Sequence, residues 1–214
     1  MAVVPTIPDR ECAICPRLAD FRAANRAVHG DWFNAPVPSF GDSGASLLIV
    51  GLAPGLKGAN RTGRPFTGDH AGDLLYSTLL KFGLAAGAYG AHSGDGLVLV
   101  DTRITNAVRC VPPQNKATGP EVKGCGSFLA GEIAAMANLK VVLALGLLAH
   151  GAVASALSLK KSALKFAHGA FHPLPGGLTL GDSYHCSRYN TNTGRLTETM
   201  FHGVFADIMP ILGG

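Results

Sequence analysis

A glycine- and proline-rich stretch over residues 51–70 brings together residue types that could carry out chemistry. It follows a short apolar run at 46–50, which predicts a buried strand, and it contains one aromatic ring, Phe66, and one carboxylate, Asp69. A strand that leads into such a loop exposes backbone amides, and open α/β folds bind ligands there. The stretch lacks the Gly-Lys-Ser/Thr ending of a nucleotide-binding phosphate loop. We therefore expect an active site here that is not a nucleotide loop.

The cysteines form a second group. There are five, an odd number in a sequence without an export signal, so metal ligation is a better interpretation than a disulfide framework. Cys12 and Cys15 are separated by two residues, and the turn between them can bring both sulfurs to one metal centre.

The apolar pattern predicts the elements that position these residues. Strands are expected at 46–50, 97–100 and 140–146, helices at 16–29, 69–80, 128–139, 147–157 and from 197 onward, a short strand pair within 160–181, and a polar loop at 183–197. Strands that alternate with helices indicate a parallel sheet covered on both faces.

Composition limits the classes of function. A chain of 214 residues with 47% hydrophobic and 15% charged residues can bury one core, so we expect a single domain over 1–214 without extended disorder. No apolar run approaches the ~20 residues of a membrane span, so a soluble, intracellular protein without a membrane partner is expected. The net charge of +4 is compatible with a polyanionic partner but does not require one.

Four motifs follow one another along the chain. They are Gly51-Leu52-Ala53-Pro54-Gly55, Gly63-Arg64-Pro65-Phe66-Thr67-Gly68-Asp69, Thr105-Asn106-Ala107-Val108-Arg109-Cys110, and His185-x-Ser187-x-x-Asn190-x-x-Thr193-Gly194-Arg195-Leu196-Thr197. Together with the cysteines they resemble the uracil-DNA glycosylase superfamily, and most of all its family 5, the type B enzymes that carry an iron-sulfur cluster. The resemblance implies a three-layer αβα fold of the α/β class with a central, mainly parallel four-stranded sheet.

The same resemblance implies an activity. The chain would be a monofunctional DNA repair glycosylase that flips uracil, and other deaminated or damaged bases, out of DNA and hydrolyses the N-glycosidic bond to leave an abasic site. We expect a monomer in the cytoplasm, associated with the nucleoid in a prokaryote. The alternatives are a non-catalytic or covalently trapping uracil-DNA binder on the same fold, and a zinc module that binds nucleic acid without chemistry.

Roles for individual residues also follow from the resemblance. Phe66 would stack on the flipped base, and Asn106 would bind the edge of a pyrimidine. His185 would donate a hydrogen bond to the base oxygen on which negative charge gathers as the bond breaks. The rest of the pocket would be formed by Gly51, Ala53, Ser187 and Asn190. On the sequence alone, Phe66 could instead be an ordinary core residue and Asn106 could cap a turn.

Two positions depart from the superfamily pattern. Where other families have a residue that positions water, this chain has Leu52 and Ala53, so Asp69 remains to orient water or stabilise the sugar cation. Asp69 could also be a helix N-cap, and both roles could hold together. In the last motif Cys186 replaces a usual proline, which frees the backbone amide and leaves the loop shape open.

Residues that would contact DNA lie in the same loops. Arg188 and Tyr189 occupy the stretch that in relatives wedges into the duplex, and Arg64 and Arg195 are candidates for phosphate contacts. Further basic candidates are Lys57, Arg61, Arg109 and Lys116, although any one of them could be an ordinary solvated residue.

The resemblance assigns four thiols to one metal centre. Cys12, Cys15, Cys110 and Cys125 match the cysteine pattern of the family 4 and 5 enzymes, and four thiolates are what a [4Fe-4S] cluster needs. Structural zinc is the chief alternative, because four cysteines also bind zinc. In either case we expect a structural, DNA-orienting role and no redox catalysis.

Overall fold

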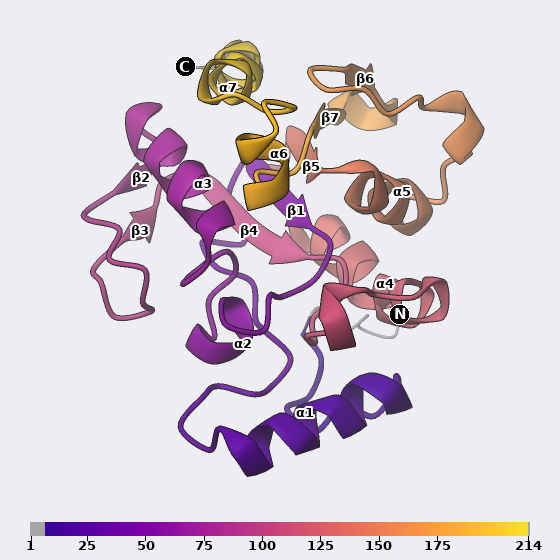
Figure 1. The fold of residues 1–214 in the computed structure, drawn as a ribbon. Coiled ribbons are helices and arrows are strands. Elements are labelled where there is room, and N and C mark those ends of the chain that lie inside the picture. Colours follow the sequence, from indigo (N-terminus) through magenta and orange to yellow (C-terminus); the bar gives the residue numbers. More distant parts are fainter. Residues whose placement is uncertain (1–6, 214) are drawn as a thin grey trace.

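The computed structural model describes residues 7–213 and is built around a five-stranded sheet (Figure 1). The strand order is β4-β1-β5-β7-β6, with β1 at Leu47–Gly51, β4 at Thr102–Asn106, β5 at Val141–Leu145, β6 at Phe171–Pro173 and β7 at Thr179–Ser183. Neighbours among β4, β1, β5 and β7 are parallel, whereas β6 pairs antiparallel with β7 at the edge. The mainly parallel α/β sheet is thus confirmed, with one strand more than expected.

Two layers of helices cover the sheet. In β1, Leu47 and Ile49 face a core shared with α3 (His70–Lys81) and α7 (Glu198–Leu212). Leu48 and Val50 face the opposite core, shared with α4 (Gly119–Ala135) and α5 (Leu147–Ala156). In Figure 1, α3 lies to the left of the sheet and α4 and α5 to the right. Because both faces are buried, β1 is apolar at every position before Gly51, as strands of parallel sheets are.

The remaining elements of the described part of the chain are α1 and several short ones. They are α1 (Pro16–Val28), α2 (Ala59–Thr62), β2 (Ala85–Ala86), β3 (Val98–Leu99), α6 (Arg188–Asn192) and the 3₁₀ turns η1 (Pro113–Asn115), η2 (Lys161–Ala163) and η3 (Pro175–Gly177). Within residues 7–213, no helix is both long and apolar enough to cross a bilayer.

The prediction of a core strand at 97–100 is wrong. Residues 98–99 form β3, which pairs only with β2 in a separate two-stranded ribbon, and Val98 and Val100 are exposed. The strand beside β1 is instead β4, which was not predicted because its sequence is more polar. Its Arg103 is tolerated because Glu132 on α4 accepts a hydrogen bond from its Nε at 2.6 Å.

Two helix expectations also change. The helix expected at 128–139 is α4, which starts earlier, where the carboxylate of Glu121 accepts the backbone amide of Thr118 at 2.8 Å. The expected polar loop at 183–197 contains the short helix α6, which begins where the Ser187 hydroxyl accepts the amide of Asn190. The starts of α3 at His70 and α7 at Glu198 are confirmed.

Candidate active site

A cavity of about 630 Å³ opens at the carboxyl ends of β1 and β4. All four motifs contribute to its lining, together with a few residues between them. The lining residues are Leu52, Ala53, Pro54, Gly55, Lys57, Ala59, Phe66, Gly68, Asp69, His70, Ala71, Asn106, Asn115, His185, Ser187 and Arg188. Most of the expected catalytic and base-binding residues therefore meet in one place, because parallel strands deliver their following loops to the same edge of the sheet. Gly51 and Asn190, which were also expected to form the pocket, are not among the residues that line it.

The two rings expected to act on the base face each other in this cavity. The centroids of Phe66 and His185 are 5.8 Å apart, with an angle of 28° between the ring planes. The two residues belong to the loops after β1 and β7, far apart in the sequence. A flat molecule stacked on Phe66 would thus have an imidazole beside it.

Gly51 and Asn106 end the two strands that form the floor of the cavity. They are register partners in the β1–β4 pair. A Cβ atom on Gly51 would lie 2.5 Å from Oδ1 of Asn106 and 2.6 Å from Cζ of Phe66, so only glycine lets the ring and the amide approach each other here. The side chain of Asn106 makes no hydrogen bond to the described residues. Its amide N–H and its carbonyl oxygen are therefore both available to a ligand.

The backbone of Phe66 is held in an uncommon conformation. Its φ is +52°, in the left-handed region that non-glycine residues seldom adopt. The hydroxyl of Tyr76, buried in the core, donates to the carbonyl of Pro65 at 2.7 Å, and that of Thr67 donates to the same carbonyl at 3.1 Å. These bonds fix the turn that points the ring into the cavity.

Arg64 supports this turn from inside the protein. The residue is 4% exposed, and its guanidinium donates to Thr67 Oγ1 at 2.8 Å and forms two hydrogen bonds to the carboxylate of Asp95, at 2.8 and 2.6 Å. A buried and fully engaged arginine cannot also contact a phosphate, so the DNA-binding role expected for Arg64 is corrected to a structural one. Arg109 is likewise buried and bonded to Glu132 at 2.5 Å, so it is not a surface contact either.

Asp69 is the N-cap residue of α3 by position, but its side chain makes no capping hydrogen bond. Its carboxylate packs against the first loop, since a Cβ atom on Gly55 would lie 2.9 Å from Asp69 Oδ2. Oδ1 is buried and has no hydrogen-bond partner in the described structure. Burial, partly opposed by the nearby amides of Gly72 and Ala71, raises the pKa of Asp69. A carboxylate without its capping bond fits a role beyond that of a helix cap.

His185 is held by the short helix that follows it. The side-chain amide of Asn190 donates to the His185 carbonyl at 2.8 Å, and the Ser187 hydroxyl caps α6. Burial lowers the pKa of His185 to about 4, so the imidazole is neutral at pH 7 and carries one N–H. Ser187 and Asn190 thus position His185.

Cys186 ties this loop to the other side of the cavity. Its thiol is fully buried and donates to the carbonyl of Ala71 at 3.3 Å. Beside it, His70 Nε2 and the hydroxyl of Thr191 are 2.9 Å apart, which joins α3 to α6. The thiol gives the loop an anchor that proline, with no donor, could not supply.

The remaining residues expected to wedge into the duplex or contact phosphates lie on the surface. Arg188 lines its rim, and Tyr189 is 72% exposed on α6. Arg195 is exposed, with its guanidinium 4.7 Å from the ring centroid of Tyr184. No sequence pattern pointed to Asn115, which lines the cavity from the η1 turn, or to Asp95, which bonds to Arg64 31 residues away.

The four cysteines assigned to a metal surround a second, small cavity, formed by the start of α1, the segment after β4, and α4. Arg22 donates to Cys110 Sγ at 3.5 Å, and the amide of Arg109 donates to Cys125 Sγ at 3.4 Å. Four thiols around one small cavity are a donor set that suits a metal centre, either an iron-sulfur cluster or zinc.

Comparisons with known proteins agree with this geometry. The family model of the uracil DNA glycosylase superfamily matches residues 38–209. A type-5 uracil-DNA glycosylase of Thermus thermophilus is 44% identical over 207 residues, which cover 94% of each chain. Proteins with the same name from Pyrobaculum aerophilum (41% over 194 residues, 88% of this chain and 84% of the relative) and Mycobacterium leprae (38% over 212 residues, 94% and 92%) are also similar. The chain therefore belongs to the uracil DNA glycosylase superfamily.

Proposed function

We propose that this protein is a monofunctional uracil-DNA glycosylase that hydrolyses the N-glycosidic bond of a flipped uracil in DNA. The observation that carries the proposal is the meeting of Phe66 and His185, 5.8 Å apart, in a cavity that also contains Asn106 and Asp69. The type-5 name of relatives that share most of the chain supports the same activity.

Binding of the base uses the floor of the cavity. A base outside the duplex loses its stacking partners, and the ring of Phe66 replaces one of them. The amide of Asn106 offers one donor and one acceptor, which matches the alternating groups on the edge of uracil. The proposed range includes other deaminated or damaged bases, because Leu52 and Ala53 leave that wall of the cavity without a proton-handling group.

Bond cleavage needs stabilisation of charge on both sides of the breaking bond. As the base leaves it becomes an anion, and the N–H of neutral His185 stabilises this anion more than the bound substrate. The sugar becomes cationic, and the carboxylate of Asp69 is the group in the cavity that can stabilise it or orient the attacking water. Hydrolysis then leaves an abasic site.

The surroundings of the cavity supply the DNA contacts. Tyr189 presents an exposed ring that can fill the space vacated by the base, and Arg188 and Arg195 can contact phosphates. We propose a monomer that works in the cytoplasm on DNA.

The four cysteines would hold a [4Fe-4S] cluster, with zinc as the alternative. Cys12 and Cys15 precede or cap α1, and Cys110 and Cys125 belong to the body of the protein. A bound cluster would supply structural cross-linking at this place and no step of the hydrolysis.

The test is incubation of the purified protein with a uracil-containing oligonucleotide, followed by alkali. Strand cleavage at uracil supports the proposal, and an oligonucleotide with thymine at the same position is the control. A protein-DNA adduct that survives denaturing electrophoresis would indicate the covalently trapping binder instead. Retained binding with intact DNA would indicate a module without chemistry.

A further inference from the structure

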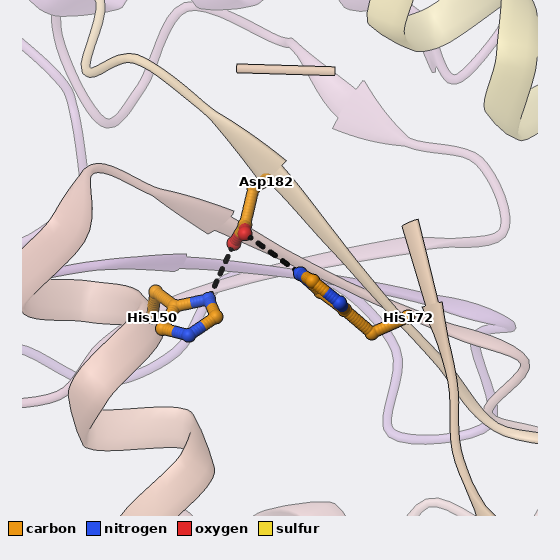
Figure 2. A group of neighbouring side chains, drawn as sticks. All are labelled: His150, His172 and Asp182. Atoms are coloured by element: carbon orange, nitrogen blue, oxygen red, sulfur yellow. Dashed lines mark hydrogen bonds and ion pairs between the residues drawn. The ribbon is translucent and has the colours of Figure 1, made fainter. Parts of the chain in front are cut away.

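Three potential metal ligands converge outside the base-binding cavity (Figure 2). His150 comes from α5, His172 from the edge strand β6 and Asp182 from β7. Their ligand atoms all lie within 4.8 Å of one another. None of the three lines the base-binding cavity, and the proposed glycosylase chemistry uses none of them.

The hydrogen bonds of His150 indicate that a cation lies between its Nδ1 and the carboxylate of Asp182. Its Nε2 lies 3.1 Å from the carbonyl oxygen of Leu164, which can only accept, so this nitrogen carries a proton. In the neutral imidazole, Nδ1 then has a bare lone pair, and it faces Oδ1 of Asp182 at 2.7 Å. Two lone pairs attract only through a cation between them, either a second proton or a metal ion.

The second contact of the carboxylate brings a third potential ligand to the same place. His172 Nε2 lies 3.2 Å from Oδ2 of Asp182, so both oxygens of one buried carboxylate face imidazole nitrogens. Protons alone can satisfy this arrangement if His150 is protonated and a neutral His172 donates its Nε2 proton to Oδ2, whereas one metal ion would replace these protons and bind all three side chains. A carbonyl that accepts the distal N–H of His150 is also the partner that orients metal-bound histidines.

We propose that His150, His172 and Asp182 form a binding site for one divalent transition-metal ion, for which zinc is the best chemical match. Two imidazoles and one carboxylate suit zinc, whereas magnesium and calcium prefer sites made of oxygen ligands alone. This site is independent of the glycosylase activity and of the four cysteines.

The distances agree with a small adjustment on binding. Zinc bonds of ~2.0–2.2 Å at tetrahedral angles place neighbouring ligand atoms about 3.4 Å apart. The contact between His172 and Asp182, at 3.2 Å, is close to this value. The 2.7 Å contact between His150 and Asp182 must widen by about 0.7 Å to reach this spacing, which rotation of the imidazole can provide.

The position of the site gives the metal an entry and a structural effect. His150 and Asp182 are buried, whereas the His172 side chain is 16% exposed, so solvent approaches from β6 and can occupy the open coordination position. Asp182 lies in β7 just before the loop that carries His185. A bound ion would therefore join α5 and β6 to the strand that leads to the proposed catalytic histidine.

The test measures zinc in the purified protein with its cysteine site intact. After dialysis against ZnCl2 and removal of free metal, mass spectrometry of metals is compared for the wild type, His150→Gln, His172→Gln and Asp182→Asn. The matched control is His92→Gln, at an exposed histidine remote from the cluster in sequence. We expect one zinc ion fewer in each of the three variants and no change in the control. X-ray absorption of the wild-type zinc should include a site with nitrogen and oxygen ligands and no sulfur.

The Asp182→Asn variant shows whether a loss of bound zinc could be due to misfolding. An asparagine amide can donate to His150 Nδ1 while its carbonyl accepts from His172, so the hydrogen bonds persist without the charge. It should fold and melt like the wild type in EDTA, and zinc should raise the Tm of the wild type alone. If zinc does not raise the wild-type Tm, or if all bound zinc has sulfur ligands only, a proton occupies the cluster and the proposal is wrong.

Discussion

Burial holds the pKa of His185 at about 4, and this value decides what the side chain can do. A histidine that donates a hydrogen bond to a departing anion needs one N–H, and a neutral imidazole has one. The same burial excludes water from the bond, and a donor in a dry site stabilises an anion more than one in water does. A neutral donor beside Phe66 is thus consistent with leaving-group stabilisation as its main contribution.

Replacement of His185 tests that contribution. We expect His185→Ala to lower the single-turnover rate on a uracil oligonucleotide about 10²- to 10³-fold, the loss typical of removing one such donor. Binding of the DNA, followed by fluorescence anisotropy, should change little. His92→Ala, at an exposed histidine outside the cavity, is the control. A rate within threefold of the wild type would remove His185 from the mechanism.

The raised pKa of Asp69 predicts both a pH profile and a stability effect. The carboxylate must be ionised to act on the sugar or water, so the rate should rise with pH through a pKa above the ordinary 3.8. In Asp69→Asn this rise should disappear and the rate should stay low at every pH. A raised pKa also means that the folded state binds the proton more tightly than the unfolded state, so ionisation costs stability as pH rises. Asparagine should therefore raise the Tm at pH 7. An unchanged acid limb of the rate profile in Asp69→Asn would show that another group titrates.

At the scale of elements, the loop after β1 depends on a buried ion pair. Arg64 and Asp95 are 5% and 2% exposed at their side chains, and the pair holds the turn of Phe66 through Thr67. The Arg64 guanidinium is the main cause of the lowered pKa of Asp95. Arg64, which was expected to bind phosphate, instead stabilises the loop that forms the base-binding site.

Breaking that pair should damage stability and catalysis together. Arg64→Ala leaves the Asp95 carboxylate buried without its partner, so we expect a loss of about 3–5 kcal/mol in the free energy of unfolding. Chemical denaturation measures it, and single-turnover kinetics should show a slower rate as Phe66 loses its fixed turn. Arg61→Ala, at an exposed arginine of α2, should cost less than about 0.5 kcal/mol. Equal stability of the two variants would contradict the bracing role.

The elements also show which parts of the fold could be predicted. Strands buried on both faces, such as β1 and β5, are continuous apolar runs, so periodicity located them. The polar strand β4 has no such signal, because its Arg103 is neutralised by Glu132 on a distant helix. The sequence pattern therefore favoured the apolar run beside it, which proved to be an exposed ribbon.

The sequence predicted which residues line the site better than it predicted the hydrogen bonds that hold them there. Four motifs placed Phe66, Asn106 and His185 correctly in one cavity, because each motif follows a strand or precedes a helix at the same edge. The partner of Arg64 could not be foreseen, since Asp95 is 31 residues away in a glycine-rich connection. The bond from Cys186 to Ala71 spans 115 residues and has no local signature.

At the scale of the whole molecule, the cysteine site links α1 to the body of the protein. Cys15 is the N-cap of α1, whereas Cys110 and Cys125 lie next to the apolar cluster of Leu18, Val108 and Phe128. This cluster is small, so a metal bound by four thiolates would add much of the attachment.

If the four cysteines hold the proposed cluster, its removal should therefore loosen α1 first. We expect Cys12→Ser to lower iron content, to lower the Tm and to make α1 the earliest site of limited proteolysis, while far-UV circular dichroism of the sheet persists. Cys186→Ser, at the thiol outside this set, should keep its iron. A colourless wild-type protein that contains zinc and no iron would replace the cluster with the zinc alternative.

The distribution of charge over the molecule predicts how it binds DNA. The net charge is +4, and exposed Arg195 lies on the loop that follows α6, the helix whose first residue, Arg188, lines the cavity. A phosphate contact releases counterions, so Arg195→Ala should reduce the slope of log affinity against log salt by about 1, equally on uracil-containing and undamaged DNA. Lys81→Ala, at the end of α3 opposite to the cavity, should leave the slope unchanged. A loss confined to uracil-containing DNA would mean that Arg195 recognises the damaged nucleotide, because a contact to the backbone alone must weaken every sequence alike.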